Sequence, residues 1–147
     1  MRALIAYLTY SGNTEEVAEI VGLELEKYDV SITWHRIGFD KVPNMDTFDV
    51  IFLGTFTWDY GETPEEVKDF VLDVGYKPKN MAIFGTGDTQ FGPESQYCLA
   101  VDKLAKFYHS PWPGLKIEQS PRGAQEKDVK NWVKGVMQHA TNITFAR

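Results

Sequence analysis

A short hydroxyl-rich segment is the first part of the chain whose residue types could bind a ligand. It follows an apolar run at 3–8, precedes a helical pattern over 13–27, and consists of Thr9, Tyr10, Ser11, Gly12, Asn13 and Thr14. A turn between a strand and a helix directs backbone N–H groups and hydroxyls at one point, which attracts an anion, usually a phosphate. No Lys or Arg lies between Ala3 and Lys27. The sequence therefore predicts a phosphate held by neutral donors and the helix dipole.

Helix capping is a second interpretation of the same segment. Ser11 or Asn13 could be the N-cap, and Asn13 with Glu16 has the spacing of a capping box. Capping accounts for one or two of these residues but does not require three hydroxyls and a glycine. On this segment alone, both interpretations stay open.

Two later segments each combine glycine, threonine, an acidic residue and an aromatic ring after an apolar run. The candidate ligand-binding residues of the first are Thr55, Phe56, Thr57, Trp58, Asp59, Tyr60 and Gly61. Those of the second are Thr86, Gly87, Asp88 and Phe91. Aromatic rings on polar loops beyond a strand end are not needed for the core. Trp58 and Phe91 together could therefore hold a flat ring between them.

Strand-like and helix-like segments alternate along the chain, which predicts an α/β domain with a parallel sheet. The predicted strands lie near 2–8, 30–37, 49–55, 80–85 and 115–119. The predicted helices lie near 13–27, 64–74, 95–109 and 125–139, and the connection 39–48 has room for a short helix.

The polarity of each predicted strand indicates its place in the sheet. The first, third and fourth strands are continuously apolar, as in strands buried on both faces, whereas the second and fifth alternate, as at a sheet edge. The predicted order is therefore 2-1-3-4-5, doubly wound, with right-handed crossovers that place helices on both faces. Because ligands of such sheets bind at the carboxyl ends of the strands, all three candidate loops lie at the binding edge.

Composition restricts the class of protein. A length of 147 residues predicts one domain, and 43% hydrophobic residues suffice for a core. With 15 basic and 21 acidic residues the net charge is −6, which disfavours nucleic acid and anionic membranes as partners and favours basic proteins.

The cysteine, histidine and hydropathy patterns favour a cytoplasmic protein without a bound metal, and we also expect a monomer. Cys98 is the only cysteine, so no internal disulfide can form, and a reducing compartment fits. The N-terminus shows no signal peptide, and no apolar stretch is long enough to cross a membrane. His35, His109 and His139 have no metal-binding spacing.

Four motifs, in order along the chain, resemble those of short-chain flavodoxins. They are Thr9-x-Ser11-Gly12-x-Thr14, Gly54-x-x-Thr57-Trp58, Gly85-x-Gly87-Asp88 and Tyr97-Cys98-x-Ala100-Val101-Asp102. Flavodoxin is itself the standard example of the order 2-1-3-4-5. The segment 114–120 is continuous, without the extra loop that interrupts the fifth strand in long-chain members. The resemblance covers essentially the full chain and implies a flavodoxin-like fold, non-covalently bound FMN and low-potential electron transfer without a substrate of its own.

The resemblance also implies roles for single residues. The loop 9–14 would hold the FMN phosphate, and Trp58 would stack on one face of the flavin. Phe91 stands where the family usually has a stacking Tyr, and Phe56 where many members have a small or hydroxyl residue. Asp59 stands where short-chain members often have Gly, in a turn that responds to reduction.

Cys98 and the acidic residues near the loops are the remaining candidates. Cys98 begins a helix near the flavin, so its thiol pKa could be lowered, although packing against ribityl or core atoms explains its place better. Six acids follow the presumed flavin loops: Asp59, Glu62, Glu65, Glu66, Asp88 and Glu94. A charge ~10 Å from the reduced ring costs roughly 1–2 kcal/mol at an effective dielectric near 20, which would lower the potential. The same acids would steer a basic flavodoxin reductase and electron-accepting enzymes.

Three other functions share parts of this pattern. A flavodoxin dedicated to activating ribonucleotide reductase is similar but usually shorter. An FMN-dependent quinone or diflavin-type reductase would need a substrate pocket that no spare loop provides. A signalling receiver domain of the same topology would need clustered acids where this chain has hydroxyls.

Overall fold

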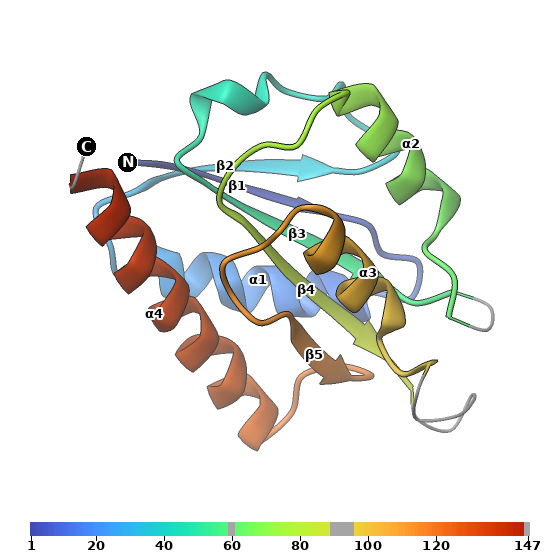
Figure 1. The fold of residues 1–147 in the computed structure, drawn as a ribbon. Helices are drawn as coiled ribbons and strands as arrows, with labels where there is room; N and C mark the ends of the chain where they lie inside the picture. Colours follow the sequence, from blue (N-terminus) through green and yellow to red (C-terminus); the bar gives the residue numbers. More distant parts are fainter. Residues whose placement is uncertain (59–60, 89–95, 146–147) are drawn as a thin grey trace.

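The computed structural model describes residues 1–58, 61–88 and 96–145. Five strands alternate with four α-helices and one short 3-10 helix (Figure 1). In chain order they are β1 Arg2–Tyr7, α1 Asn13–Leu25, β2 Ser31–Arg36, η1 Met45–Thr47, β3 Val50–Phe56, α2 Glu65–Val74, β4 Met81–Gly87, α3 Leu99–Phe107, β5 Leu115–Glu118 and α4 Ala124–Phe145. The short helix predicted within 39–48 is thus confirmed as η1.

The sheet is parallel throughout, with the order β2-β1-β3-β4-β5. The predicted order is confirmed, and its physical reason is visible in the burial of the strands. β3 and β4 are buried along almost their whole length, whereas most residues of β2 are partly or fully exposed. Continuously apolar strands occupy the centre because both of their faces are covered by helices.

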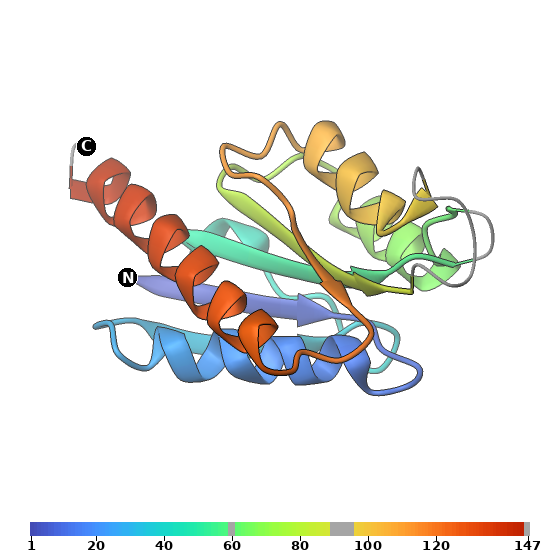
Figure 2. The same cartoon turned by 90° about the horizontal axis from the view of Figure 1, so that it is seen from below.

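Two helical layers enclose the sheet. Figure 2 shows α1 and α4 on one face and α2 and α3 on the other. The hydrophobic core divides in the same way: residues of α1 and α4 pack with one set of strand side chains, and residues of α2 and α3 with the alternate set. The side-chain period of two along each strand places alternate residues in opposite layers.

Several element boundaries differ from the prediction. The helix predicted from residue 95 begins only at Leu99, because Cys98 has a left-handed φ of 50° that a right-handed helix cannot contain. The strand predicted to end at residue 85 continues to Gly87, which pairs with Glu118 of β5. The last helix also continues beyond residue 139, and Ala140 on that added turn is buried.

Within the described ranges, no helix is both long and apolar enough to cross a membrane.

Candidate functional site

The loops that follow β1, β3 and β4 leave the same edge of the sheet, the edge toward which the strand arrows point in Figure 1. The first loop leads into α1 through Gly12, which is the N-cap residue and has a φ of 96°. Only glycine adopts this region without strain. No side chain caps the helix, so the predicted capping by Ser11 or Asn13 is wrong. The first-turn N–H groups of α1 thus have no side-chain acceptor.

The hydroxyls of the first loop point in different directions. Thr9 Oγ1 accepts a hydrogen bond from the Gly12 N–H at 2.9 Å, which closes the loop on itself. Thr14 is buried, and its hydroxyl lies 2.9 Å from that of Thr86 on β4. Ser11 is exposed. Two of the three predicted hydroxyls therefore fix the loop to itself and to the sheet, and only Ser11 faces outward.

Three aromatic rings meet beside the first loop. Tyr10 lies 4.8 Å from Phe56 and 5.6 Å from Trp58, measured between ring centroids, and Phe56 lies 5.9 Å from Trp58. Tyr10 is 58% exposed and Trp58 is 53% exposed. The family resemblance implied a place near the phosphate for Phe56. In the structure, its ring packs against the exposed rings of Tyr10 and Trp58.

A hydrogen bond ties the first loop to α2. The Tyr10 hydroxyl donates to the Glu66 carboxylate, and this bond raises the pKa of Tyr10. Glu66 lies in the first turn of α2, where a carboxylate also favours the helix dipole. Sequence reasoning treated Glu66 only as a charge, because nothing local predicts a partner 56 positions away.

The backbones of Trp58 and Glu62 are paired. The backbone of Trp58 exchanges two hydrogen bonds with that of Glu62, at 2.7 and 2.6 Å. Gly61 has a φ of 92°, and a Cβ there would stand 2.8 Å from Leu99 Cδ2. The Gly61 carbonyl accepts from Lys103 Nζ at 2.9 Å. Lys103 therefore joins Gly61 to α3.

The two threonines of the second loop have structural partners. Thr55 is fully buried, and its hydroxyl donates to the Phe56 carbonyl at 2.9 Å. Thr57 Oγ1 accepts from the Ala100 N–H at 3.1 Å, so it caps the first turn of α3 from another loop.

The described part of the third loop, Gly87 and Asp88, lies next to the start of α3. A Cβ on Gly87 would stand 3.0 Å from Cys98 Sγ, so the two backbones approach closely. Asp88 accepts from the Gln119 side chain at 3.1 Å. Burial raises the pKa of the Cys98 thiol to about 11, against a smaller opposing hydrogen bond from Tyr97. Of the two interpretations of Cys98, the lowered pKa is therefore wrong, and the preferred one, packing against core atoms, is confirmed by its burial.

The structure also brings charges to the site that the sequence alone did not place. Arg36 at the end of β2 shares a hollow of about 450 Å³ with Thr9 and Tyr10. Lys68 Nζ lies 3.5 Å from Glu62 and 3.6 Å from Glu65, so two of the predicted acids are partly compensated. Lys68 stands three residues after Glu65 on α2, whereas the approach of Arg36 to Thr9 depends on the fold.

Asp59, Tyr60 and Phe91 fall outside the described residues. Glu94 does as well. In the parts of the chain that are described, no group of three or more His, Cys, Asp or Glu side chains could hold a metal ion.

Comparison with known proteins agrees with this geometry. The family profile described as Flavodoxin matches residues 5–132. The chain is 31% identical over 140 residues to a protein named probable flavodoxin 2 of Bacillus subtilis strain 168, covering 89% of this chain and 91% of that protein. It is 34% identical over 141 residues to probable flavodoxin 1 of the same strain, covering 88% of this chain and 84% of that one.

A solved structure shows the same likeness in three dimensions. The crystal structure of oxidised flavodoxin 2 from Bacillus cereus superposes with a TM-score of 0.81 at 28% identity, covering 95% of this chain and 99% of that chain. The profile match and the relatives above 30% identity together cover most of the chain. The chain belongs to the flavodoxin family.

Proposed function

We propose that the three loops at the carboxyl edge hold FMN and that the protein passes single electrons between a reductase and acceptor enzymes. Family membership supports the general part of this function: flavodoxins carry electrons on non-covalently bound FMN and are carriers rather than enzymes. The dedicated ribonucleotide-reductase activator and the FMN-dependent reductase are not favoured by these relatives. Which residues of this chain contact FMN is the specific part of the proposal.

The phosphate end of FMN fits the first loop. The N–H groups of the first turn of α1 have no side-chain cap, and Gly12 opens the backbone, since a Cβ there would meet nothing within 4 Å. The Ser11 hydroxyl and the N–H groups of Asn13 and Thr14 are the proposed donors. Arg36 adds a positive charge at the side of this loop, so the site is less neutral than its sequence neighbours indicate.

The ring end of FMN fits beside Trp58 of the second loop. Trp58 presents an exposed indole, supported by Tyr10 and Phe56, to the space beyond the strand ends. Such a ring can stack on a flavin and exclude water from one of its faces. The single observation that carries the proposal is this exposed aromatic group beside an uncapped helix N-terminus.

Buried hydroxyls hold these groups in place. Thr14 and Thr86 join α1 to β4, Thr55 bonds to its neighbour's carbonyl, and Thr57 caps α3. We infer that these threonines position the loops and that Ser11 and Trp58 are the side chains that touch FMN. Cys98 positions the third loop by close packing, since a Cβ on Gly87 would stand 3.0 Å from its Sγ.

FMN supplies the redox chemistry, and the residues around it set the potential. The acids that remain near the loops are Glu62, Glu65, Glu66 and Asp88, of which two are paired with Lys68. Their negative field opposes added electrons, and it also attracts basic protein surfaces, an attraction that salt screens. A carrier of this kind requires at least one donor and one acceptor protein.

FMN titration of the purified apoprotein tests the placement and the function together. We expect one FMN per chain, strong quenching of flavin fluorescence by Trp58, and no oxidation of NADPH by the loaded protein alone. Addition of a flavodoxin reductase and cytochrome c should then restore electron flow. A protein that leaves FMN fluorescence unchanged, or that oxidises NADPH unaided, would contradict the proposal.

A further inference from the structure

An open groove of about 360 Å³ lies between α2 and α3, on the face of the sheet opposite α1 and α4 (Figure 2). Four apolar residues line it: Val71, Leu72, Leu104 and Phe107. Leu72 is 76% exposed and Phe107 is 42% exposed, so much of this apolar surface can be reached from solvent. Accessible apolar surface that is shared by two neighbouring helices is typical of a docking site.

Lysine side chains stand at both ends of the apolar part of the groove. Lys68 and Lys103 line the groove one helical turn before Leu72 and Phe107. At the other end, where α3 finishes, Lys77 Nζ lies 4.3 Å from the centroid of the Phe107 ring. Among the described residues that line the groove, none is acidic.

Only one of these three lysines has an ion-pair partner in the described part of the chain. Lys68 Nζ lies 3.5 Å from Glu62 and 3.6 Å from Glu65, so its charge is partly compensated. No carboxylate of the described residues lies within 4.0 Å of Lys77 or Lys103. The groove therefore attracts negative charge, although the whole protein is acidic.

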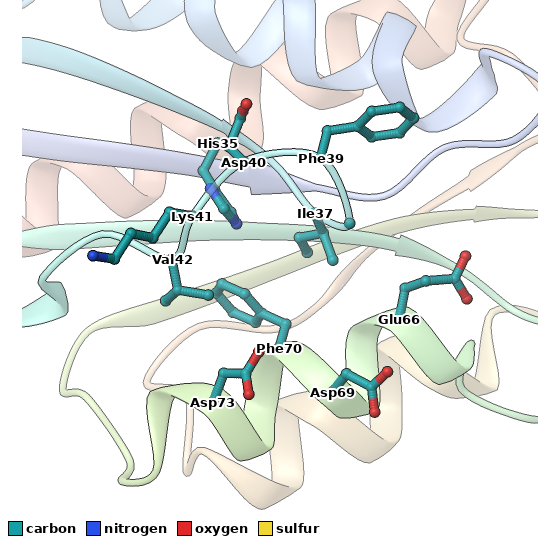
Figure 3. A pocket seen from close by; sticks show the side chains of 11 residues that line it. His35, Ile37, Phe39, Asp40, Lys41, Val42, Glu66, Asp69, Phe70 and Asp73 are labelled. Carbon is teal, nitrogen blue, oxygen red and sulfur yellow. The ribbon is translucent and has the colours of Figure 1, made fainter.

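The other acids of these two helices lie away from the groove. Three acids of α2 line a separate hollow against the loop 37–42 (Figure 3), namely Glu66, Asp69 and Asp73. Asp102 of α3 pairs with a lysine of β5 at 2.6 Å. α2 is thus acidic toward the loop 37–42, and apolar and basic toward α3.

The outer side of α1 carries a surface of complementary character. Leu23 is 62% exposed there. Glu19 and Glu26 are exposed four residues before it and three residues after it, which places all three on one stripe of the helix. Neither glutamate has an ion-pair partner among the described residues. The stripe therefore presents an apolar side chain between two carboxylates, whereas the groove presents apolar side chains between lysines.

We propose that the α1 stripe of one copy, Glu19, Leu23 and Glu26, packs into the α2–α3 groove of a second copy. Leu23 contacts Leu72 and Phe107, and the two glutamates meet the lysines at the two ends of the groove. Laying an apolar helix stripe into a groove between helices is a common mode of recognition. Opposite charges on both sides of the apolar contact fix its register.

The placement of the two surfaces makes this contact head to tail. α1 lies on one face of the sheet and the groove on the other (Figure 2), so a copy that donates its α1 still has an open groove. Heterologous contacts of this kind extend into open chains unless the rotation closes a ring. Ser11 and Trp58 belong to neither surface, so the side chains proposed to touch FMN are not part of the contact.

We expect this association to be weak. The net charge of −6 repels two copies, and the contact consists of one stripe in one groove. A dissociation constant of about 1 mM leaves the protein monomeric at micromolar concentration, where FMN titrations are made.

Sedimentation equilibrium of the FMN-loaded protein tests the contact directly. Between about 20 μM and about 2 mM, the weight-average mass should rise continuously and reach at least about 1.5 times the monomer mass. A constant mass would show that the two surfaces do not meet and would overturn the proposal. A mass that levels off at twice the monomer would indicate a closed dimer and would overturn the head-to-tail contact.

The two exposed leucines allow a test by mixing. Leu23→Gln impairs the stripe, Leu72→Gln impairs the groove, and each alone should weaken association roughly fivefold or more. An equimolar mixture pairs the intact groove of the first variant with the intact stripe of the second. Its mean mass should therefore exceed that of either variant at the same total concentration, and a mixture no heavier than its components would overturn the proposal.

Phe39→Gln is the matched control for the two leucine variants. Phe39 is 74% exposed and belongs to neither surface, so this variant should associate like the parent protein. A loss as large as that of Leu23→Gln would mean that association depends only on total exposed apolar surface, and the proposal would fail.

A charge test separates the contact from general repulsion between copies. Glu19→Gln with Glu26→Gln removes two of the 21 acids, which lowers the general repulsion, yet association should weaken because the carboxylates opposite the lysines are lost. Asp69→Asn with Asp73→Asn removes the same charge outside the groove and should leave association equal or stronger. If the two double variants associate equally, the glutamates of α1 have no specific partners and the proposal is wrong.

Discussion

Two tryptophans of this protein expose nearly the same fraction of their surface, yet their surroundings differ. Trp34 on β2 is 48% exposed and Trp58 after β3 is 53% exposed. Trp34 fills a space that exists because α1 has a glycine there: a Cβ on Gly22 would stand 2.6 Å from its ring. Its ring also meets Tyr7 edge to face, at 6.4 Å between centroids.

Trp58 has no such helix and strand surface behind it among its described contacts. Its ring partners are Tyr10 and Phe56, and Tyr10 is itself exposed. Exposure alone therefore does not mark a functional aromatic residue. The two residues differ in what packs against the ring. Other elements of the fold pack closely on Trp34, as Gly22 does, whereas one face of Trp58 is free to bind a ligand.

The largest expected effect comes from a negative charge placed beside the proposed phosphate site, on the loop next to Trp58. The variant Ser11→Asp should lower FMN affinity at least a hundredfold. Two unit charges ~6 Å apart at an effective dielectric near 20 repel by about 3 kcal/mol, which is roughly two powers of ten. FMN dissociation constants of the variant and the parent protein, from fluorescence titration, give the ratio directly.

Riboflavin and a second serine serve as controls for this variant. Riboflavin lacks the phosphate, so its affinity should change less than about twofold, since no second charge is present. Ser31→Asp places the same charge on an exposed serine at the start of β2, the opposite edge of the sheet, and should leave FMN affinity unchanged. Equal losses for FMN and riboflavin would mean that the first loop does not hold the phosphate.

Removing each tryptophan in turn tests the contrast itself. Trp58→Ala should weaken FMN binding roughly ten- to a hundredfold, the equivalent of about 1–3 kcal/mol for an aromatic stacking contact. Trp34→Ala should leave FMN binding within about twofold but lower the free energy of unfolding by about 1–2 kcal/mol, because a half-buried ring is lost.

Urea unfolding at two FMN concentrations distinguishes the two losses. A stability deficit that comes from weaker cofactor binding depends on FMN concentration, whereas a packing deficit does not. We expect the first behaviour for Trp58→Ala and the second for Trp34→Ala. The same behaviour for both variants would abolish the distinction drawn here.

A smaller effect is expected at the contact that supports Trp58 from the side. Tyr10→Phe keeps the ring beside Phe56 and Trp58 but removes the hydroxyl that donates to Glu66. FMN affinity should fall roughly two- to fivefold, since the bond is exposed to water. Spectrophotometric titration should also lose one tyrosine of raised pKa, because the Glu66 bond raises the pKa of Tyr10. Glu66→Gln is the reciprocal variant, and it should lower that pKa while Tyr10 remains.

The sheet order could be predicted from the sequence because the burial of a strand is reflected in the polarity of its own residues. The apolar runs of β3 and β4 and the mixed polarity of β2 indicate central and edge positions without knowledge of any partner. The three loops then follow from the parallel arrangement, since their strands end at one edge.

The directions of the hydroxyls could not be predicted in this way. Thr14 bonds to Thr86, 72 positions away, and Thr57 to the backbone of Ala100, 43 positions away. A threonine in a polar loop has the same local sequence whether it faces a ligand or the sheet. The same holds for Arg36, whose approach to Thr9 depends on the pairing of β2 with β1.

An effect that appears only at high pH is expected at Cys98, whose burial confirms the preferred sequence interpretation that it packs against core atoms. Burial raises the pKa of this thiol to about 11, from an ordinary value of 9.0. Above pH 9 the unfolded chain loses the proton and the folded protein keeps it, so the unfolded state binds fewer protons. Stability is therefore full below pH 9 and falls as the pH rises toward 11.

The loss of unfolding free energy has an upper limit, and a variant can measure it. One group contributes at most about 1.4 kcal/mol per pH unit, so between pH 8 and 10.5 Cys98 should remove about 1–2 kcal/mol of unfolding free energy. Tyrosines also titrate in this range, and the contributions of those that do not contact Cys98 cancel because they are present in both proteins. Tyr97 is the exception, since Cys98 helps to raise its pKa, so the difference between the two proteins reports Cys98 together with its effect on Tyr97. Urea unfolding of both, at fixed excess FMN, should show the shallower pH dependence in Cys98→Ala. Parallel curves would mean that the thiol is open to water. The close approach of Gly87 to Cys98 would then not exclude water from the start of α3.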